Sequence, residues 1–263
     1  MPSAPLTTPP RPTLFVLSTA EPDAVLDFYD QVCGWKLELS SAAGMGRAAG
    51  AGEQAFFVRK GPVGWLPFLT VADLQGALER AKAAGGRVVF PLPDDDTGRS
   101  AAVFDPSDTR LGLWAVDDPD VSAADQAIYH GQIVWMEEKT RDQQAAAAFH
   151  SEVFGFAAAG PTGPGKVQLL RGNNGPSYAG VMQFDERWAS DHPPHWLLYV
   201  SVDDLDKTIE QALAAGGSVW FKPTDTPLGR LAYLRDPAGN AFAVVEVAPA
   251  ARGMLFAPAA GAN

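Results

Sequence analysis

The chain repeats its own pattern, and this repetition constrains the fold more than any other feature of its 263 residues. The segment DFYDQVCGW at 27–35 is matched by AFHSEVFGF at 148–156, which lies 121 residues later. The turn sequence DPSD at 105–108 recurs as DPAG at 236–239, which lies 131 residues later. The second copy therefore carries ten extra residues, and we expect two domains of one fold.

Each copy divides once more into two units, because glycines end a predicted helix at four matching places. These glycines are Gly34, Gly85, Gly155 and Gly216. Glycine accepts the left-handed backbone geometry of a helix end. Each unit opens with a short strand-like run, continues with an amphipathic helix and closes with further strands, so it reads β-α-β-β-β. The opening runs span 14–17, 67–71, 133–135 and 197–202.

The domain organisation follows from this pattern. We expect a first domain over 12–117, a linker over 118–128, a second domain over 129–248 and a flexible tail over 249–263. The ten extra residues fall in the third unit, where 183–194 is the bulkiest segment. A loop of that size is a candidate lid over a binding site, although surface loops are usually only surface.

The composition fits a folded protein and excludes several partners. Hydrophobic residues make up 46% and charged residues 19%, which can form a substantial core. The net charge is -11 and no stripe of Lys and Arg offsets it, so nucleic acid is not an expected partner. No segment resembles a signal peptide or has the roughly 18 apolar residues of a membrane helix. We expect no membrane partner, and a soluble, cytoplasmic monomer or homodimer.

Common catalytic signatures are absent from the sequence. The single cysteine, Cys33, lies at a predicted helix end and is typical of a packing residue. The sequence has no P-loop, HExxH, CxxC or nucleophile elbow, and no helical pattern follows GMGRAAG at 44–50. Phosphoryl transfer, zinc hydrolysis and serine hydrolysis therefore have no support, and we expect no cofactor.

The four units, their helix ends and the DPxG-like turns together resemble the vicinal-oxygen-chelate superfamily of glyoxalase and bleomycin-resistance proteins. The segments 135–142, 193–206 and 229–244 look like its tandem, two-domain branch. The resemblance covers about residues 12–248. It implies an α+β fold of two tandem domains, each with two βαβββ units whose mostly antiparallel strands form a U-shaped sheet around a cavity.

The resemblance also implies where a metal would bind. Metal-using members place a His, Gln or Glu on the first strand of a unit and a Glu on its last strand, which suits a hard divalent ion. In this sequence the securely aligned positions hold Leu14, Gly112, Trp135 and Ala243. The others fall near Phe57, Leu66, Gly180 or Met182, and Leu197. We therefore expect no metal.

Strand alternation predicts which side chains face each cavity, because residues two apart share a face. In the first domain these are Leu14, Val16, Ser18, Leu66, Phe68, Thr70, Arg110, Gly112 and Trp114, a mostly apolar wall. In the second they are Trp135, Glu137, His195, Leu197, Tyr199, Ala241, Ala243 and Val245. The second domain keeps more polar groups, so we expect the site there.

Three of these side chains are candidate catalytic residues. Glu137 is the first, because a carboxylate in an apolar strand must be hydrogen-bonded or have a raised pKa; bracing of the strand by backbone N–H bonds is an equal alternative. His195 could move protons near neutral pH, or could only cap the strand entrance beside the prolines before it. Tyr199 could orient a ligand oxygen, or could be an aromatic core residue.

The candidate ligand-binding residues are Trp135, Met182, Leu197, Ala243 and His192. Trp135 would offer a flat surface to an aromatic ligand, and His192 lies in the candidate lid. His150 takes the helix position of Tyr29 in the first copy, and we expect it to face its helix surroundings.

These residues favour a metal-independent enzyme that acts on an apolar, aromatic or polyketide-like small molecule by acid/base chemistry, as in a dehydration, cyclisation or isomerisation. The first alternative is a protein that binds and sequesters such a molecule unaltered. The second is a metal-dependent lyase or dioxygenase whose ligands the alignment did not recognise.

Overall fold

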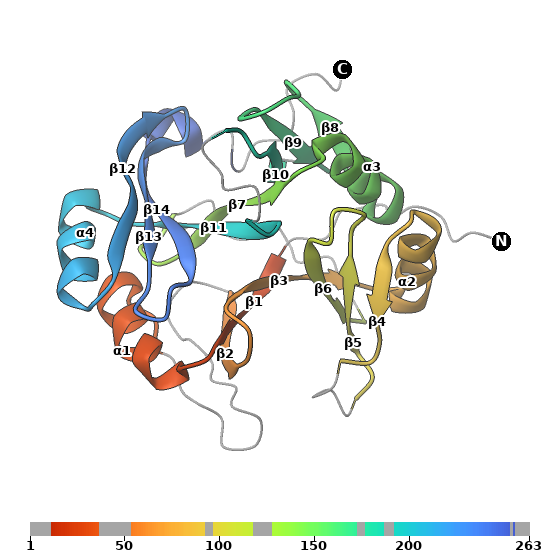
Figure 1. The fold of residues 1–263 in the computed structure, drawn as a ribbon, viewed down its shortest axis with the longest axis horizontal. Coiled ribbons are helices and arrows are strands. Elements are labelled where there is room, and N and C mark those ends of the chain that lie inside the picture. Colours follow the sequence, from red (N-terminus) through yellow and green to blue (C-terminus); the bar gives the residue numbers. More distant parts are fainter. Residues whose placement is uncertain are drawn as a thin grey trace.

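The described residues fold into two sheets and four helices (Figure 1). The structure is a computed structural model and describes residues 12–36, 54–92, 97–117, 128–172, 177–186, 192–252 and 255. The first half contains β1 (Pro12–Thr19), α1 (Pro22–Cys33), β2 (Ala55–Lys60), β3 (Gly64–Val71), α2 (Leu74–Ala83), β4 (Arg87–Val89), β5 (Ser100–Phe104) and β6 (Arg110–Ala115). The second contains β7 (Ile133–Thr140), α3 (Gln143–Phe154), β8 (Ala157–Ala159), β9 (Val167–Arg171), β10 (Ser177–Gln183), β11 (His195–Ser201), α4 (Leu205–Ala214), β12 (Ser218–Thr226), β13 (Gly229–Arg235) and β14 (Ala241–Val247).

Each half forms one mixed, mostly antiparallel sheet. The first sheet has the order β2-β1-β3-β6-β5-β4, and the second has the order β12-β13-β14-β11-β7-β10-β9-β8. The central pairs, β1 with β3 and β7 with β11, are antiparallel, and each central strand has a parallel partner on its other side. The predicted α+β fold of two tandem domains is confirmed.

The helices begin and end where the sequence indicates. Asp73, Asp142 and Asp204 cap α2, α3 and α4, because each carboxylate accepts a backbone N–H bond from the first turn. Gly34 and Gly155 end α1 and α3 with φ of 69° and 74°, the left-handed geometry that glycine tolerates.

The helices of the first domain pack against those of the second. Helix α1 lies beside α4, and α2 lies beside α3, with β3 and β11 in contact between them (Figure 1). One apolar core runs through both domains and includes Phe15 of the first and Phe242 of the second. Two smaller apolar clusters lie apart from this core, one on the inner face of each sheet. The inner faces therefore point away from the interface between the domains.

A reciprocal contact explains one of the duplicated motifs. A Cβ atom on Gly86 would lie 2.6 Å from Cε2 of Phe149, and a Cβ atom on Gly217 would lie 2.7 Å from Cε2 of Phe28. Each helix phenylalanine thus packs on the second glycine of the Gly-Gly pair in the other domain. A larger residue at either glycine would push the domains apart.

Buried polar groups also lie where the domains meet. The hydroxyl of Tyr29 donates to Asp236, with 3.1 Å between the oxygens. At the helix position that matches Tyr29, His150 Nε2 lies 2.6 Å from Oε2 of Glu138 in the same domain. Asp105 of the first domain lies close enough to the same Glu138 for their charges to interact. His150 therefore faces its helix surroundings, as the sequence predicts, and not the inner face of its sheet.

Two neighbouring buried carboxyl groups such as Asp105 and Glu138 repel each other unless one of them is protonated. Burial is the largest cause that raises the pKa of Asp105, followed by the charge of Glu138, and together they raise it to about 8. A carboxyl group whose pKa is higher in the folded chain than in the unfolded chain stabilises the fold at low pH. That contribution is lost as the pH rises through about 8.

The other predicted regions are only partly described. Most of the predicted linker, 118–127, lies outside the described residues. In the predicted flexible tail, Pro249–Ala251 form a 3₁₀ helix and the side chains of Ala251 and Leu255 are buried. In the part of the chain that the structure describes, no helix has the length and apolar character needed to cross a membrane.

We predict that Asp105→Asn flattens the loss of stability with rising pH. Asparagine stays neutral, keeps the oxygen that accepts the N–H bonds of Ser107 and Thr109, and offers N–H to Glu138. At a pH of about 8, the free energy of unfolding in urea should exceed that of the wild type by at least about 1.4 kcal/mol, the equivalent of one pKa unit.

Asp108→Asn is the matched control, since Asp108 lies in the same turn but is exposed and paired with Arg87. It should leave the pH dependence of the wild type unchanged. An identical pH dependence in Asp105→Asn and the wild type would contradict the assignment.

Candidate functional site

Strand β7 presents different chemistry on its two faces. Glu138 points to the domain interface, whereas Trp135, Glu137 and Lys139 lie on the inner face of the second sheet. Lys139 is fully buried and Glu137 is 4% exposed. Such burial of a charge is unfavourable unless each group has partners. The inner face therefore has to contain a paired polar network.

A small residue lets two tyrosines meet on this face. Ala243 of β14 lies in register with Tyr199 of β11 on one side and Tyr233 of β13 on the other. Since alanine projects no side chain beyond Cβ, the two phenols approach above it, with 3.1 Å between their oxygens. The Tyr199 hydroxyl donates a short hydrogen bond to Glu137 Oε2.

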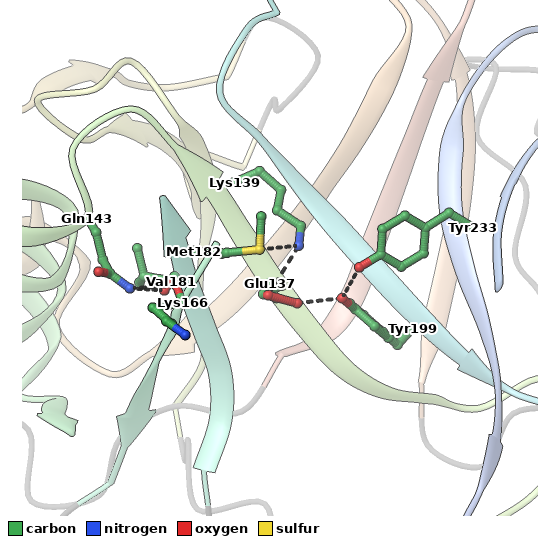
Figure 2. A network of polar contacts seen from close by, with 8 residues as sticks. All are labelled: Glu137, Lys139, Gln143, Lys166, Val181, Met182, Tyr199 and Tyr233. Carbon is green, nitrogen blue, oxygen red and sulfur yellow. Dashed lines mark hydrogen bonds and ion pairs between the residues drawn. The ribbon is translucent and has the colours of Figure 1, made fainter. Parts of the chain in front are cut away.

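Lys139 completes the network (Figure 2). Its Nζ lies 3.1 Å from Glu137 Oε1 and 3.2 Å from the sulfur of Met182 on β10. The ammonium group balances the charge of Glu137 inside an otherwise apolar wall. The result is a chain of contacts from Lys139 through Glu137 and Tyr199 to Tyr233, whose side chain is half-buried.

Glu137 fixes the direction of the hydrogen bonds along this chain. The carboxylate of Glu137 can only accept, so Tyr199 uses its single proton there and accepts from Tyr233. Burial is the main cause that raises the pKa of Tyr199 well above its usual value, and the charge of Glu137 raises it further. Tyr199 therefore stays protonated in the resting protein.

His195 lies outside this network. Its Nδ1 is 3.0 Å from the carbonyl oxygen of Pro193, so Nδ1 carries the proton. Burial is the main cause that lowers the pKa of His195 to about 4, and the nearby His192 and Lys139 lower it further. The imidazole is therefore neutral near pH 7. The contact with Pro193 fits the alternative that His195 caps the strand entrance.

His192 forms part of an aromatic rim at one end of the inner face. Its ring lies 4.9 Å from the ring of His195 and 5.8 Å from that of Trp220 on β12. The segment before β11 therefore reaches β12, although β13 and β14 lie between β11 and β12 in the sheet. The loop residues 187–191 of the candidate lid lie outside the described residues.

The predicted ligand-binding residues gather on the inner face. Trp135, Leu197, Tyr199 and Ala243 belong to one apolar cluster there, together with Val245 and Leu231. Met182 reaches the same region through its contact with Lys139. The face predicted by strand alternation is thus assembled, whereas the roles of its residues stay predictions.

The residues at the metal positions do not fit a divalent ion. Trp135, Leu197 and Ala243 offer no donor atoms, and the soft sulfur of Met182 already accepts a bond from Lys139. In the first domain, a Cβ atom on Gly112 would lie only 2.5 Å from the ring of Phe68, so the ring leaves no room for a side chain at this position. Within the described ranges, no three His, Cys, Asp or Glu side chains are grouped to hold an ion.

Comparison with known proteins decides the family. The sequence pattern of the "Glyoxalase/Bleomycin resistance protein/Dioxygenase superfamily" matches residues 132–244, and that of the "Glyoxalase-like domain" matches 14–114. "Putative glyoxylase CFP32" of Mycobacterium tuberculosis is 30% identical over 254 residues, covering 89% of this chain and 93% of the relative. The chain belongs to the glyoxalase/bleomycin resistance protein/dioxygenase superfamily.

Two further superfamily relatives are informative. "Anthracycline biosynthesis protein DauV" of Streptomyces is 29% identical over 262 residues, covering 91% of this chain and 94% of that protein. The crystal structure of a Mn(II)-bound glyoxalase from Novosphingobium aromaticivorans aligns with a TM-score of 0.65 at 15% identity, covering 98% of this chain and 93% of that one. At that identity the likeness establishes the superfamily fold alone.

Sequence reasoning missed two residues of the network, Lys139 and Tyr233. The predicted strand stopped at Trp135, but β7 continues to Thr140, and alternation from Trp135 through Glu137 would have placed Lys139 on the inner face. Tyr233 was assigned to a strand, but its face was not worked out. Its register with Ala243 places it on the inner face.

We predict that Lys139→Met destabilises the protein by about 3 kcal/mol, because it leaves the buried charge of Glu137 without its cation. The double variant Lys139→Met with Glu137→Gln should recover at least half of that loss, since no buried charge then lacks a partner. The measurement is the free energy of unfolding in urea for the wild type, both single variants and the double variant. Simple additivity of the two single effects would contradict the coupling.

Proposed function

We propose that the inner face of the second domain binds an apolar, aromatic small molecule and transforms it by proton transfer without a metal. The observation that supports this most is the hydrogen-bonded chain from Tyr233 through Tyr199 to Glu137. A carboxylate at the buried end and a half-buried phenol at the other make a path for one proton.

The proposed step moves a proton away from the ligand. An acidic O–H or C–H of the ligand gives its proton to the Tyr233 oxygen, Tyr233 passes its own proton to Tyr199, and Tyr199 passes its proton to Glu137. Glu137 becomes neutral, and the negative charge that it held is now on the ligand. Lys139 supplies the positive charge nearby that stabilises this anion, and the reverse path returns the proton at another ligand atom.

The surroundings support an aromatic ligand. The wall around the network is apolar, with Trp135, Leu231 and Val245 beside the two tyrosines. An aromatic molecule can pack flat against such a wall while one oxygen reaches the phenol. DauV is named for anthracycline biosynthesis, and anthracyclines are aromatic molecules of this kind. The expected reaction is therefore an isomerisation, cyclisation or dehydration of such a compound.

We predict that Glu137→Gln abolishes proton transfer while ligand binding persists. The probes are hydroxyanthraquinones that carry a ketone with α-hydrogens. Exchange of those hydrogens with deuterium from the solvent, followed by NMR, should fall at least about 100-fold in the variant. The dissociation constant, measured by titration calorimetry, should change by less than about 3-fold, because glutamine keeps the size and one acceptor oxygen.

Glu138→Gln is the matched control, since Glu138 is the next residue, is equally buried and points to the opposite face. The Glu138→Gln variant should catalyse the exchange of ligand hydrogens at the wild-type rate. Binding without exchange in the wild type would instead support the sequestration alternative, and wild-type exchange in Glu137→Gln would rule out the assigned role of Glu137.

A further inference from the structure

The inner face of the second domain carries a cation that the proton path does not use. This cation is Arg235, the last residue of β13, and alternation places it on the same face as Tyr233, because residues two apart share a face. Leu234, which lies between them, belongs to the core on the opposite face. Arg235 also pairs with Ala241 of β14, which packs against the inner cluster. The Arg235 side chain therefore lies on the wall of the candidate site.

Trp220 of β12 positions this guanidinium. The central carbon of the Arg235 guanidinium lies over the indole, 4.6 Å from the centre of the ring. The same indole ring lies 5.8 Å from the ring of His192 and 6.4 Å from that of Tyr233. A guanidinium that contacts a ring through its face can still donate from the N–H groups that lie in its plane. Arg235 and Trp220 thus lie beside both the aromatic rim and the half-buried end of the proton path.

Arg235 has no acidic partner in the part of the chain that the structure describes. Its Nε is buried there without a hydrogen-bond partner, and none of the described ion pairs includes its guanidinium. Acids are not scarce, since the chain has 31 Asp and Glu against 20 Lys and Arg. Arg230, earlier on the same strand, contacts both carboxylate oxygens of Asp206, at 2.7 and 2.9 Å. A half-buried cation without such a pair is stabilised when a ligand supplies the anion.

Two other cations of the second sheet are less suited to this role. Lys139 is fully buried and already contacts Glu137 and the sulfur of Met182. Arg171 of β9 also has a buried Nε without a described partner, but β9 and β13 lie on opposite sides of the central strands β7 and β11. A ligand that reaches Tyr233 is therefore next to Arg235 and not next to Arg171.

We propose that the ligand of the second domain is an aromatic acid, and that Arg235 binds its carboxylate while the ring system lies on the apolar wall. An ionised carboxylate matches the planar, forked N–H groups of a guanidinium better than a neutral oxygen does. The Cα atoms of Arg235 and Tyr233 are about 7 Å apart along the strand, so a ligand of two fused rings can place its carboxylate at Arg235 and another oxygen at Tyr233. This inference rests on the proposed binding of an aromatic molecule to this face, but not on proton transfer.

The experiment compares 6-hydroxy-2-naphthoate with 6-hydroxy-2-naphthamide, which share one shape and differ in charge, by titration calorimetry at neutral pH. The wild type should bind the carboxylate at least about 10-fold more tightly than the amide, the effect of one charge-assisted hydrogen-bonded pair. Arg235→Gln should reduce that preference to less than about 3-fold. Its affinity for the amide should stay at the wild-type value, which also establishes that the variant is folded with its apolar wall intact.

Three control variants locate the effect. Arg230→Gln removes the exposed arginine of the same strand that pairs with Asp206, and it should keep the wild-type preference. Arg171→Gln changes the opposite side of the sheet and should keep it too. Tyr233→Phe removes the hydroxyl at the half-buried end of the proton path but leaves the cation. It should therefore abolish deuterium exchange in the hydroxyanthraquinone probes and retain the preference for the carboxylate.

Several results would overturn the proposal. Equal binding of the two probes by the wild type would do so, as would an equal loss of the preference in Arg230→Gln and Arg235→Gln. Loss of the preference in Arg171→Gln alone would place the carboxylate on the other side of the sheet and would also overturn it. Binding of neither probe would contradict the aromatic site itself. A wild-type preference without deuterium exchange would instead contradict proton transfer alone, so the two proposals fail in different ways.

Discussion

Two neighbouring carboxyl groups, Glu137 and Glu138, are buried on opposite faces of β7, and the arrangement of the second domain depends on how each is satisfied. A buried charge is tolerated only with partners. Glu138 has His150 of α3 as a partner in its own domain and lies near Asp105 of the first domain. Glu137 finds them on the inner face, in Lys139 and Tyr199. One strand therefore both fixes the domain arrangement and builds the candidate site.

Comparison of the two domains shows which residues of the first domain correspond to the polar network of the second. Val16, Leu17 and Ser18 of β1 lie at the positions that Glu137, Glu138 and Lys139 take in β7. Phe68 covers Gly112 in the first domain much as Tyr199 covers Ala243 in the second. The added hydroxyl of tyrosine and the added carboxylate convert an apolar wall into a hydrogen-bonded chain.

The sequence was sufficient for the fold and for the faces of the strands. Repeats of the Phe28 and Asp105 segments predict two copies, and alternation places Trp135, Leu197, Tyr199 and Ala243 together, as the inner cluster confirms. It was not sufficient for contacts that depend on strand length or on the packing of distant segments. Lys139 was missed because charged residues at the end of β7 hide its continuation as a strand.

Contacts between the copies were also out of reach. The Phe149–Gly86 packing and the nearness of Asp105 to Glu138 depend on how the two domains dock, which no local sequence pattern shows. For His195 the sequence left proton transfer and strand capping open. Its hydrogen bond to Pro193 and its lowered pKa are consistent with capping.

We propose that the chain of Glu137, Tyr199 and Tyr233 moves protons in this protein without a metal ion. The most direct test measures deuterium exchange of the hydroxyanthraquinone probes by protein that has been dialysed against EDTA, with its metal content determined by mass spectrometry. We expect the metal-free protein to exchange the α-hydrogens at an unchanged rate. Loss of exchange on chelation, with recovery when Mn²⁺ or Fe²⁺ is added back, would contradict it.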